Sequence, residues 1–444
     1  YLNLSKFFVD ERGQQPHYYD LEARQRGEDP HSFWAKDYRY CQAHAPLREQ
    51  DGVTGHAVRA CYLYAGAADI ALETGDAELL EVVRTLWDDL TQRQMYVTGG
   101  IGSTHVVEGF SSPYDLPNEN AYGETCASAA LVFLGQRMFQ LDPDSRYVDV
   151  MERALYNGMI SGVSYEGSHF FQANPLAAYP NISPYDRLSS LGSSIHHQRQ
   201  EWFDVACCPS NLARLVASVG GYFYSTTPNR LYVHFYNQNR AQITVGGSAV
   251  QVEQQTNYPW DGEIHVVVTP AQPSRFGLAL RVPGWCRDYR LEVNGATVSV
   301  EPERGYVVIE REWQSGDEVT LSLAMPIERM MPHPFVRQDA GCVALQRGAV
   351  VYCLEEVDNG ATLASVTLPR DARLRADFDN GLFGGVVTIG GEGVRVEPAN
   401  WGGGLYQPES LLEIARTPVT IKAIPYCFWA NRQPGEMRVW VREA

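Results

Sequence analysis

The sequence predicts a multidomain protein in which a helical domain precedes antiparallel β domains. A chain of 444 residues exceeds the usual size of a single domain, so two or three domains are expected. Apolar residues recur every three or four positions up to about residue 225 and alternate after Pro228, which indicates helices first and strands afterwards. We therefore expect a helical domain at 1–226 and two β-sandwich domains at 227–330 and 331–444, divided near a cluster of prolines.

The helical half contains several amphipathic segments with clear boundaries. One apolar pattern occupies 56–72 and stops at Gly75, a residue that readily ends a helix, and the next begins at Asp76, a good N-cap. Similar patterns predict helices at 124–140, 145–158 and 209–224. The loops between them are short, which favours antiparallel helix pairs.

Strands follow with period-two alternation. The pair Asn294-Gly295 predicts a tight hairpin turn between strands at 289–293 and 296–300. Other strands are predicted at 231–236, 305–311, 318–323, 341–353 and 437–441. Regular short strands with turn signals are typical of β-sandwiches, so antiparallel sandwiches are the expected architecture.

Composition excludes some classes of partner. A formal charge of -17 disfavours nucleic-acid backbones and anionic membranes. No apolar run approaches the roughly 20 residues of a membrane-spanning helix, and the first residues do not resemble a signal peptide, so a cytoplasmic location is expected. The nine scattered cysteines fit reduced thiols and a metal site better than a disulfide framework.

Two adjacent cysteines stand in the stretch EWFDVACCPSNL. Pro209 directly after Cys208 suits the first turn of a helix, where its missing N–H is not needed. The amides and the dipole at a helix start stabilise negative charge, which would lower the pKa of Cys207 or Cys208. A thiolate at this position could serve as a metal ligand or as a nucleophile.

A second cluster, NENAYGETC, contains Glu124 and Cys126. Their spacing puts both side chains on one side only if the chain there is still extended, so a shared ion requires the helix to begin around or just after them. With Cys207 and Cys208 they form a set compatible with tetrahedral zinc. Two alternatives stay open from spacing alone: the cysteines are small buried core residues, or the neighbouring pair forms a disulfide.

The glycine-rich segment YVTGGIGSTHVVEGF holds Glu108. Its polar groups exceed what a plain connector needs, and it lacks the Gly-Lys-Ser/Thr of a phosphate-binding loop. Apolar neighbours at Val106, Val107 and Phe110 would raise the pKa of Glu108, as a general acid requires. The alternative is an ordinary solvated glutamate, the common state of this residue type.

Taken in order, these motifs resemble the β-L-arabinofuranosidases of glycoside hydrolase family 127. The matching stretches run through nearly the whole chain, and the pairing of GETC with ACCPSN is the most specific of them. Others are VDERGQQPHYYD, REQDGVTGHAVRACYL, MYVTGGIGSTHVVEGF, NYPWDG, LRVPGWC, GAVVYCLE and WANRQPGEMRVW.

The resemblance implies an (α/α)6 barrel followed by β-sandwich domains, and retaining hydrolysis of terminal β-L-arabinofuranosyl groups in an oligosaccharide or glycoconjugate. By motif position Cys207 matches the nucleophile, Glu108 the acid/base and His56 a residue that contacts the sugar. The zinc ligands of the family match Glu124, Cys126, Cys207 and Cys208. A homodimer is left open.

Two departures from the family pattern affect these expectations. About six helices precede the strands where such a barrel has twelve, so we expect N-terminal sequence, about half of the barrel, to be missing. If these 444 residues were the entire polypeptide, it should expose a large apolar face and be inactive or associated with another chain. Phe170 and Phe171 stand where relatives can carry tyrosines, which leaves the exact sugar open. Two other interpretations stay open: a glycosidase for another furanoside, and a non-catalytic sugar-binding protein with structural zinc. In the second, Trp260, Trp285 and Trp429 would line sugar-binding faces, although a place in the core is more common for tryptophan.

Overall fold

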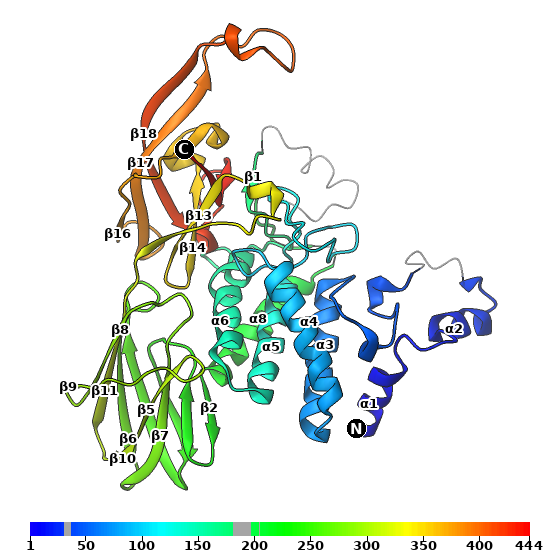
Figure 1. Cartoon of the computed structure of the whole chain (residues 1–444), viewed down its shortest axis with the longest axis vertical. Coiled ribbons are helices and arrows are strands. Elements are labelled where there is room, and N and C mark those ends of the chain that lie inside the picture. Colours follow the sequence, from blue (N-terminus) through cyan, green and yellow to red (C-terminus); the bar gives the residue numbers. More distant parts are fainter. Residues whose placement is uncertain (31–36, 181–196, 204) are drawn as a thin grey trace.

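The computed structural model describes residues 1–30, 37–180, 197–203 and 205–444 and places a helical half beside two β domains (Figure 1). This arrangement confirms the predicted order of helices followed by strands. No helix in these ranges is long and apolar enough to cross a lipid bilayer. The helices are α1 (Leu2–Glu11), α2 (Tyr18–Arg26), α3 (Ala57–Thr74), α4 (Ala77–Arg93), α5 (Thr125–Leu141), α6 (Ser145–Arg153) and α8 (Cys207–Ser218).

Helix α5 lies at the centre of the helical half. Its side chains are buried along most of its length, and it packs against α3, α6 and α8. The turn between α3 and α4 follows the predicted signals. Gly75 adopts a left-handed conformation with φ of 68° that ends α3, and the carboxylate of Asp76 accepts a hydrogen bond of 3.0 Å from the Leu79 amide at the start of α4.

The first β domain consists of two sheets around one apolar core. The first sheet has the strand order β4-β5-β6-β11-β8-β9 and the second the order β10-β7-β3-β2. All pairings between these strands are antiparallel except that of β3 with β7. The strands are β2 (Tyr224–Thr227), β3 (Arg230–Val233), β4 (Asn239–Val245), β5 (Ser248–Thr256), β6 (Glu263–Pro270), β7 (Ser274–Arg281), β8 (Tyr289–Val293), β9 (Ala296–Thr297), β10 (Tyr306–Trp313) and β11 (Asp317–Leu323).

Inward-facing side chains of both sheets form this core, as in a sandwich. Asn294 and Gly295 adopt positive φ values of 51° and 75° between β8 and β9. Two such residues in succession form the hairpin turn that the sequence predicts.

The second β domain is a closed barrel, so the prediction of a second sandwich is wrong. Six strands pair in a ring, in the order β13-β14-β18-β17-β15-β20, and β20 pairs again with β13. The pairing of β15 with β20 is parallel. The strands of this domain are β12 (Ile327–Met330), β13 (Cys342–Arg347), β14 (Val350–Glu355), β15 (Val366–Leu368), β16 (Arg375–Asp379), β17 (Val386–Pro398), β18 (Ile414–Pro425), β19 (Met437–Arg438) and β20 (Trp440–Glu443).

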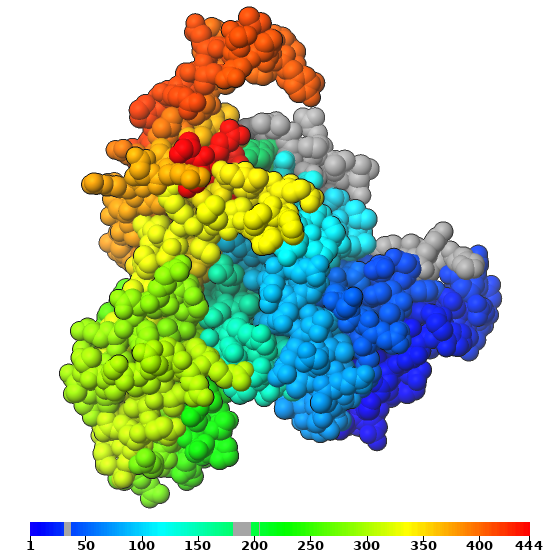
Figure 2. Space-filling view, in the orientation of Figure 1, coloured from blue at the N-terminus to red at the C-terminus, as the bar shows by residue number. Residues whose placement is uncertain are grey.

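Burial on both faces of β14 explains why alternation alone did not reveal the barrel. Tyr352 and Leu354 belong to the interior core, whereas Val351 and Cys353 pack in a second cluster with residues of the helical half. Every residue of β14 is therefore buried. Closure leaves the six ring strands without free edges, which avoids exposed pairing groups. Figure 2 shows that the hairpin of β17 and β18 projects beyond the rest of the molecule.

Buried ion pairs join the helical half to the first β domain. Arg281 on β7 is fully buried, and its guanidinium contacts the carboxylates of Asp149 and Glu152 on α6. Glu152 also accepts hydrogen bonds from the Tyr258 hydroxyl at 2.6 Å and the Trp285 indole at 3.1 Å. Removing one partner from such a cluster leaves an uncompensated buried charge.

Candidate active site

Two helices begin at the same place in the helical half. Glu124 is the residue before the first turn of α5, and Cys207 is the first residue of α8, with Pro209 in its first turn. The sequence prediction that a helix begins around Glu124 and Cys126 is confirmed, since α5 starts at Thr125 between them. The partial positive charge of two helix starts favours negatively charged groups between them.

The structure brings together the four residues predicted as metal ligands. One donor atom from each of Glu124, Cys126, Cys207 and Cys208 lies within 4.8 Å of all the others. The Sγ atoms of Cys207 and Cys208 are 3.8 Å apart, and those of Cys126 and Cys208 are 3.3 Å apart. The Oε1 atom of Glu124 lies 3.5 Å from the Cys207 sulfur and 3.6 Å from the Cys208 sulfur.

These separations fit a tetrahedral ion. Zinc–sulfur bonds of about 2.3 Å and zinc–oxygen bonds of about 2.0–2.2 Å place neighbouring tetrahedral donors roughly 3.5–3.8 Å apart. No disulfide links the cysteines, so the disulfide alternative is not supported. The second carboxylate oxygen of Glu124, Oε2, is buried and has no hydrogen-bond partner. An unpaired buried carboxylate oxygen is costly in a purely apolar packing role, which favours the ligand interpretation.

Interactions within the cluster shift the pKa values of its thiols in opposite directions. The thiols of Cys126 and Cys208 donate hydrogen bonds that lower the pKa of Cys207, and the same hydrogen-bonded network raises the pKa values of Cys126 and Cys208. Burial, with the nearby charge of Cys207, raises the pKa of Glu124 well above its usual range. A divalent cation would replace the protons that these groups otherwise share.

Cys207 is the one cysteine of this cluster that is not fully buried. Cys126 and Cys208 are buried, whereas Cys207 is half-buried. The most exposed cysteine of the cluster is therefore also the one whose pKa is lowered.

Glu108 lies against His56 at the start of α3. The Nδ1 atom of His56 accepts a hydrogen bond from the Val58 amide at 3.2 Å, so in the neutral imidazole the proton is on Nε2. Nε2 is 3.1 Å from the Oε2 atom of Glu108 and donates to it. His56 is thus both the N-cap of α3 and a partner of the candidate acid.

The predicted rise in the pKa of Glu108 is wrong. The hydrogen bond from His56 is the main cause of a lowered pKa, and it outweighs the opposing effect of burial. The apolar neighbours do not enclose the carboxylate, because the Val106 side chain is 73% exposed. The charge of Cys207 acts in the opposite direction and raises the pKa of Glu108, which shows that these two groups influence each other.

The backbone around Glu108 is fixed against the start of α3. Glu108 has a left-handed φ of 50°, and its carbonyl accepts a hydrogen bond of 3.2 Å from the Ala57 amide. At Gly109 a Cβ atom would lie 1.8 Å from the Gly55 carbonyl oxygen, so only glycine allows this approach.

Tyr122 connects the two parts of the site, and the sequence alone did not single it out. Its hydroxyl is near enough to Glu108 to lower the pKa of that carboxyl, and its own pKa is raised by burial and by the charges of Glu124 and Glu108. The Gln172 amide donates a hydrogen bond of 3.1 Å to the same oxygen. The only signal in the sequence is its place in NENAYGETC, close to the ligand candidate Glu124.

The aromatic residues considered as sugar-binding candidates lie mainly in packed surroundings. Trp429 is 1% exposed and stacks on Phe171, with ring centroids 4.8 Å apart. Trp260 and Trp285 are partly buried against the cores of the two β domains. Core packing is therefore the role that the structure supports for these tryptophans.

Comparison with known families gives three consecutive matches. The model of the β-L-arabinofuranosidase GH127 catalytic domain matches residues 1–221, that of the GH127 middle domain residues 230–325, and that of the family 127 C-terminal domain residues 327–442. Together they span almost the whole chain.

Individual relatives agree with these matches. The chain is 39% identical to a non-reducing end β-L-arabinofuranosidase of Bifidobacterium longum subsp. longum, in an alignment that covers 100% of this chain and 68% of that protein. A solved GH127 β-L-arabinofuranosidase from Geobacillus stearothermophilus T6 superposes with a TM-score of 0.94 at 49% identity, covering 100% of this chain and 69% of the other. A solved GH127 β-arabinofuranosidase gives a TM-score of 0.86 at 34% identity, covering 100% and 66%.

Proposed function

The chain belongs to the β-L-arabinofuranosidases of glycoside hydrolase family 127 and is a glycosidase, and on this premise we propose that it releases terminal β-L-arabinofuranosyl groups with retention, using Cys207 as nucleophile and Glu108 as acid/base. The observation that carries the proposal is the placement of Cys207, a half-buried residue whose pKa is lowered, in a cluster of four potential ligands. The substrate is a glycan or glycoconjugate that carries arabinofuranose.

The donor set indicates zinc as the resident ion. Three cysteine sulfurs and one carboxylate match the ligand preference of zinc and its tetrahedral geometry. Glu124, Cys126, Cys207 and Cys208 would hold it. Bound there, zinc would keep the Cys207 sulfur ionised near neutral pH and fix its direction, at some cost in nucleophilicity.

In the first step the Cys207 sulfur attacks the anomeric carbon of the arabinofuranosyl group. The bond from that carbon to the glycosidic oxygen breaks, its electron pair stays with the oxygen, and Glu108 donates a proton to it. Retaining glycosidases place the two groups about 5 Å apart across the scissile bond. The electrostatic effect of Cys207 on Glu108 supports an arrangement of this kind.

In the second step the Glu108 carboxylate removes a proton from water. The water oxygen attacks the anomeric carbon, the carbon–sulfur bond breaks, and the electron pair returns to the Cys207 sulfur. The lowered pKa of Glu108 suits this base role, since it keeps the carboxylate ionised. The first step needs the same group protonated, so we expect activity to depend on a proton that Glu108 takes up at the acidic side of its titration.

His56 positions Glu108 in both steps. Its Nε2–H donates to one carboxylate oxygen of Glu108, and the neighbouring Tyr122 hydroxyl also favours the ionised carboxylate. In addition, the resemblance of GHAVR to the family motif supports a contact between His56 and the sugar.

The finer fold assignment is also part of the proposal. We infer that helices α3, α4, α5, α6 and α8 form part of an (α/α)6 barrel, since the catalytic-domain match ends at residue 221, just after α8. The units 1–226, 227–330 and 331–444 then act as catalytic, middle and C-terminal domains. A homodimer and a cytoplasmic location remain predictions from the sequence.

Hydrolysis of a chromogenic β-L-arabinofuranoside tests the proposal. Arabinose should be released, and proton NMR of the first product should show the β anomer before it equilibrates. A panel of other pentofuranosides distinguishes the remaining alternative, a glycosidase for a different furanoside. If metal-loaded protein releases no arabinose but hydrolyses another furanoside, that furanoside would replace the β-L-arabinofuranoside as the proposed substrate. The non-catalytic alternative is disfavoured by membership of a glycosidase family.

A further inference from the structure

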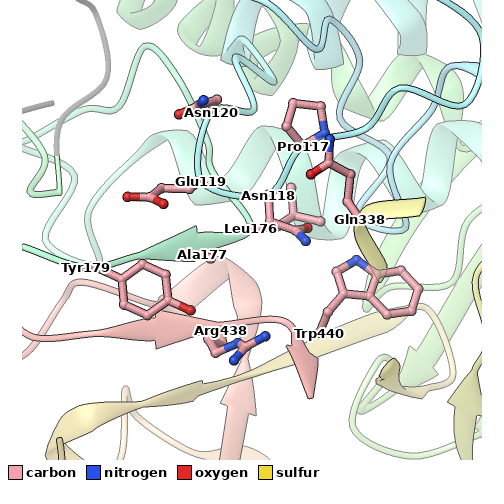
Figure 3. Close-up of a pocket in the computed structure, with 10 residues that line it drawn as sticks. All are labelled: Pro117, Asn118, Glu119, Asn120, Leu176, Ala177, Tyr179, Gln338, Arg438 and Trp440. Carbon is pink, nitrogen blue, oxygen red and sulfur yellow. The ribbon is translucent and has the colours of Figure 1, made fainter. Parts of the chain in front are cut away.

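A pocket of about 250 Å³ lies apart from the catalytic cluster, between the helical half and the β-barrel domain. Figure 3 shows Glu119 and Tyr179 on one side of it, Gln338 and Trp440 on the other, and Arg438 between them. At roughly 30 Å³ per water molecule, the volume corresponds to about eight waters, which is on the order of one monosaccharide unit.

The polar side chains of this pocket have unused hydrogen-bonding capacity. Among the described residues, none of the side chains of Glu119, Asn120, Tyr179, Gln338 and Arg438 has a hydrogen-bond or ion-pair partner. The positive charge of Arg438 acts on the hydroxyl of Tyr179 and on the buried carboxylate of Asp339, yet no described carboxylate forms an ion pair with it. Their convergence on one cavity therefore indicates a polar occupant.

The chemistry of the lining favours a neutral occupant rich in hydroxyl groups. Arg438 offers only donors and Glu119 only acceptors, so a phosphate would meet a carboxylate and a metal ion would meet a guanidinium. The amides of Asn120 and Gln338 and the hydroxyl of Tyr179 each provide both donor and acceptor. Leu176 and Trp440 add an apolar wall, which suits the C–H face of a sugar ring.

The pocket is built on the same pair of segments that carries the catalytic cluster. The Leu176 amide donates to the Asn118 carbonyl at 2.9 Å, and further along the same two segments the Thr125 amide donates to the Gln172 carbonyl at 2.9 Å. On its other side, Ala177 of β1 (Ala177–Ala178) pairs with Arg438 of β19. The side-chain amide of Asn118 donates a hydrogen bond of 2.6 Å to the carboxylate of Asp339. Together with the two backbone pairings, this bond fixes the segments that line the pocket.

We infer that this pocket binds a neutral sugar residue of the glycan that carries the arabinofuranosyl group, beyond the residue that is released. The inference rests on the proposed function for the identity of the glycan. Arg438 and Glu119 would hydrogen bond opposite sides of the sugar, and Trp440 would contact its apolar face. The site would favour extended substrates over small arabinosides.

Kinetics of two substrates test this inference. We compare wild-type protein, Arg438→Gln, Glu119→Gln and the matched control Arg442→Gln, which changes an exposed arginine on the neighbouring strand β20. On an oligosaccharide of neutral sugars capped with β-L-arabinofuranose, the two pocket variants should raise KM about tenfold, the effect of one lost charged hydrogen bond. On the chromogenic β-L-arabinofuranoside all four proteins should have equal kcat/KM.

Binding measurements separate failure of this inference from failure of the proposed function. By saturation-transfer NMR, the arabinose-free oligosaccharide should bind wild-type protein and Arg442→Gln, and lose its signal with Arg438→Gln. If arabinoside hydrolysis is absent but this pattern holds, the pocket stands and the catalytic proposal fails. Equal KM and equal NMR signals in all variants would overturn the inference, as would displacement of the oligosaccharide by inorganic phosphate, which would indicate an anion site instead.

Discussion

The Nε2 atom of His56 lies 3.1 Å from the Oε2 atom of Glu108, so the residue that caps helix α3 also holds the proposed acid/base. The imidazole of His56 therefore makes two contacts, one with each ring nitrogen. Its Nδ1 accepts from the helix backbone, which leaves the proton on the nitrogen that faces the carboxylate.

This relationship predicts a change in pH dependence for His56→Asn. Asparagine retains helix capping but removes the ring N–H that lowers the pKa of Glu108, so that pKa should rise. Because the first step needs protonated Glu108, kcat/KM falls as pH rises above this pKa. The basic limb of the profile should therefore move to higher pH in the variant. An unmoved basic limb with an otherwise folded protein would contradict the role of His56.

Replacement of Cys207 by serine should abolish turnover and weaken metal binding. A hydroxyl is a much weaker nucleophile and a poorer zinc ligand, so kcat should fall at least about a thousandfold. Steady-state kinetics and metal content by mass spectrometry measure the two effects. Cys286→Ser, a change at a half-buried thiol outside the cluster, serves as control and should leave both unchanged. Near-normal kinetics in Cys207→Ser would assign the nucleophile elsewhere.

Glu108→Gln should remove activity while metal content stays at the wild-type level. The amide cannot donate or accept the proton in either step, and Glu108 is not among the four clustered ligands. Substrates with a good leaving group need less protonation, so the first step should recover with such an arabinoside and the intermediate should accumulate on Cys207. Intact mass spectrometry would detect the added sugar. Loss of metal in this variant would argue against separate roles.

Removal of the metal should lower thermal stability. An ion that binds only the folded chain contributes about 4 kcal/mol when its free concentration is a thousandfold above Kd. A chelator should therefore lower Tm in a differential scanning experiment, and added zinc should restore it. Cys126→Ala removes one ligand of the cluster, so its Tm should already be low and should respond little to the chelator. Equal Tm values for wild-type protein with and without chelator would contradict a structural contribution of the ion.

The contact between the helical half and the first β domain should depend strongly on Arg281. Arg281→Met leaves the carboxylates of Asp149 and Glu152 without a cation in a buried setting, which costs about 3–5 kcal/mol. Arg240→Met breaks the ion pair between Arg240 and Glu253. Because the Arg240 side chain is 63% exposed, this change should lower the free energy of unfolding by only about 0–1 kcal/mol. Denaturant unfolding of both variants compares the two, and similar losses would contradict the assignment.

Local features were predictable from the sequence because their causes are local. The boundary at Gly75 and Asp76, the turn at Asn294 and the helix start at Glu124 follow from backbone preferences of a few adjacent residues. The ligand cluster was predictable because three cysteines and a glutamate near predicted helix starts are the ligand types that zinc prefers.

Features that depend on distant segments were missed. The barrel closes through the parallel pairing of β15 with β20, two strands that are far apart in the sequence and not joined by a tight turn. The alternating pattern alone therefore predicted a sandwich. The pKa of Glu108 was predicted in the wrong direction because its immediate neighbours are apolar, whereas its main partner His56 comes from another segment. The role of Tyr122 likewise becomes visible only when Glu108 and the cluster are placed around it.

The separation of the ligands along the chain has a consequence for how the enzyme matures. Glu124 and Cys207 are 83 positions apart and meet only when the first turns of α5 and α8 are docked. During synthesis the nascent polypeptide exposes the first two donors long before the last two emerge from the ribosome. An ion that uses all four donors can therefore bind only after the helical core has assembled.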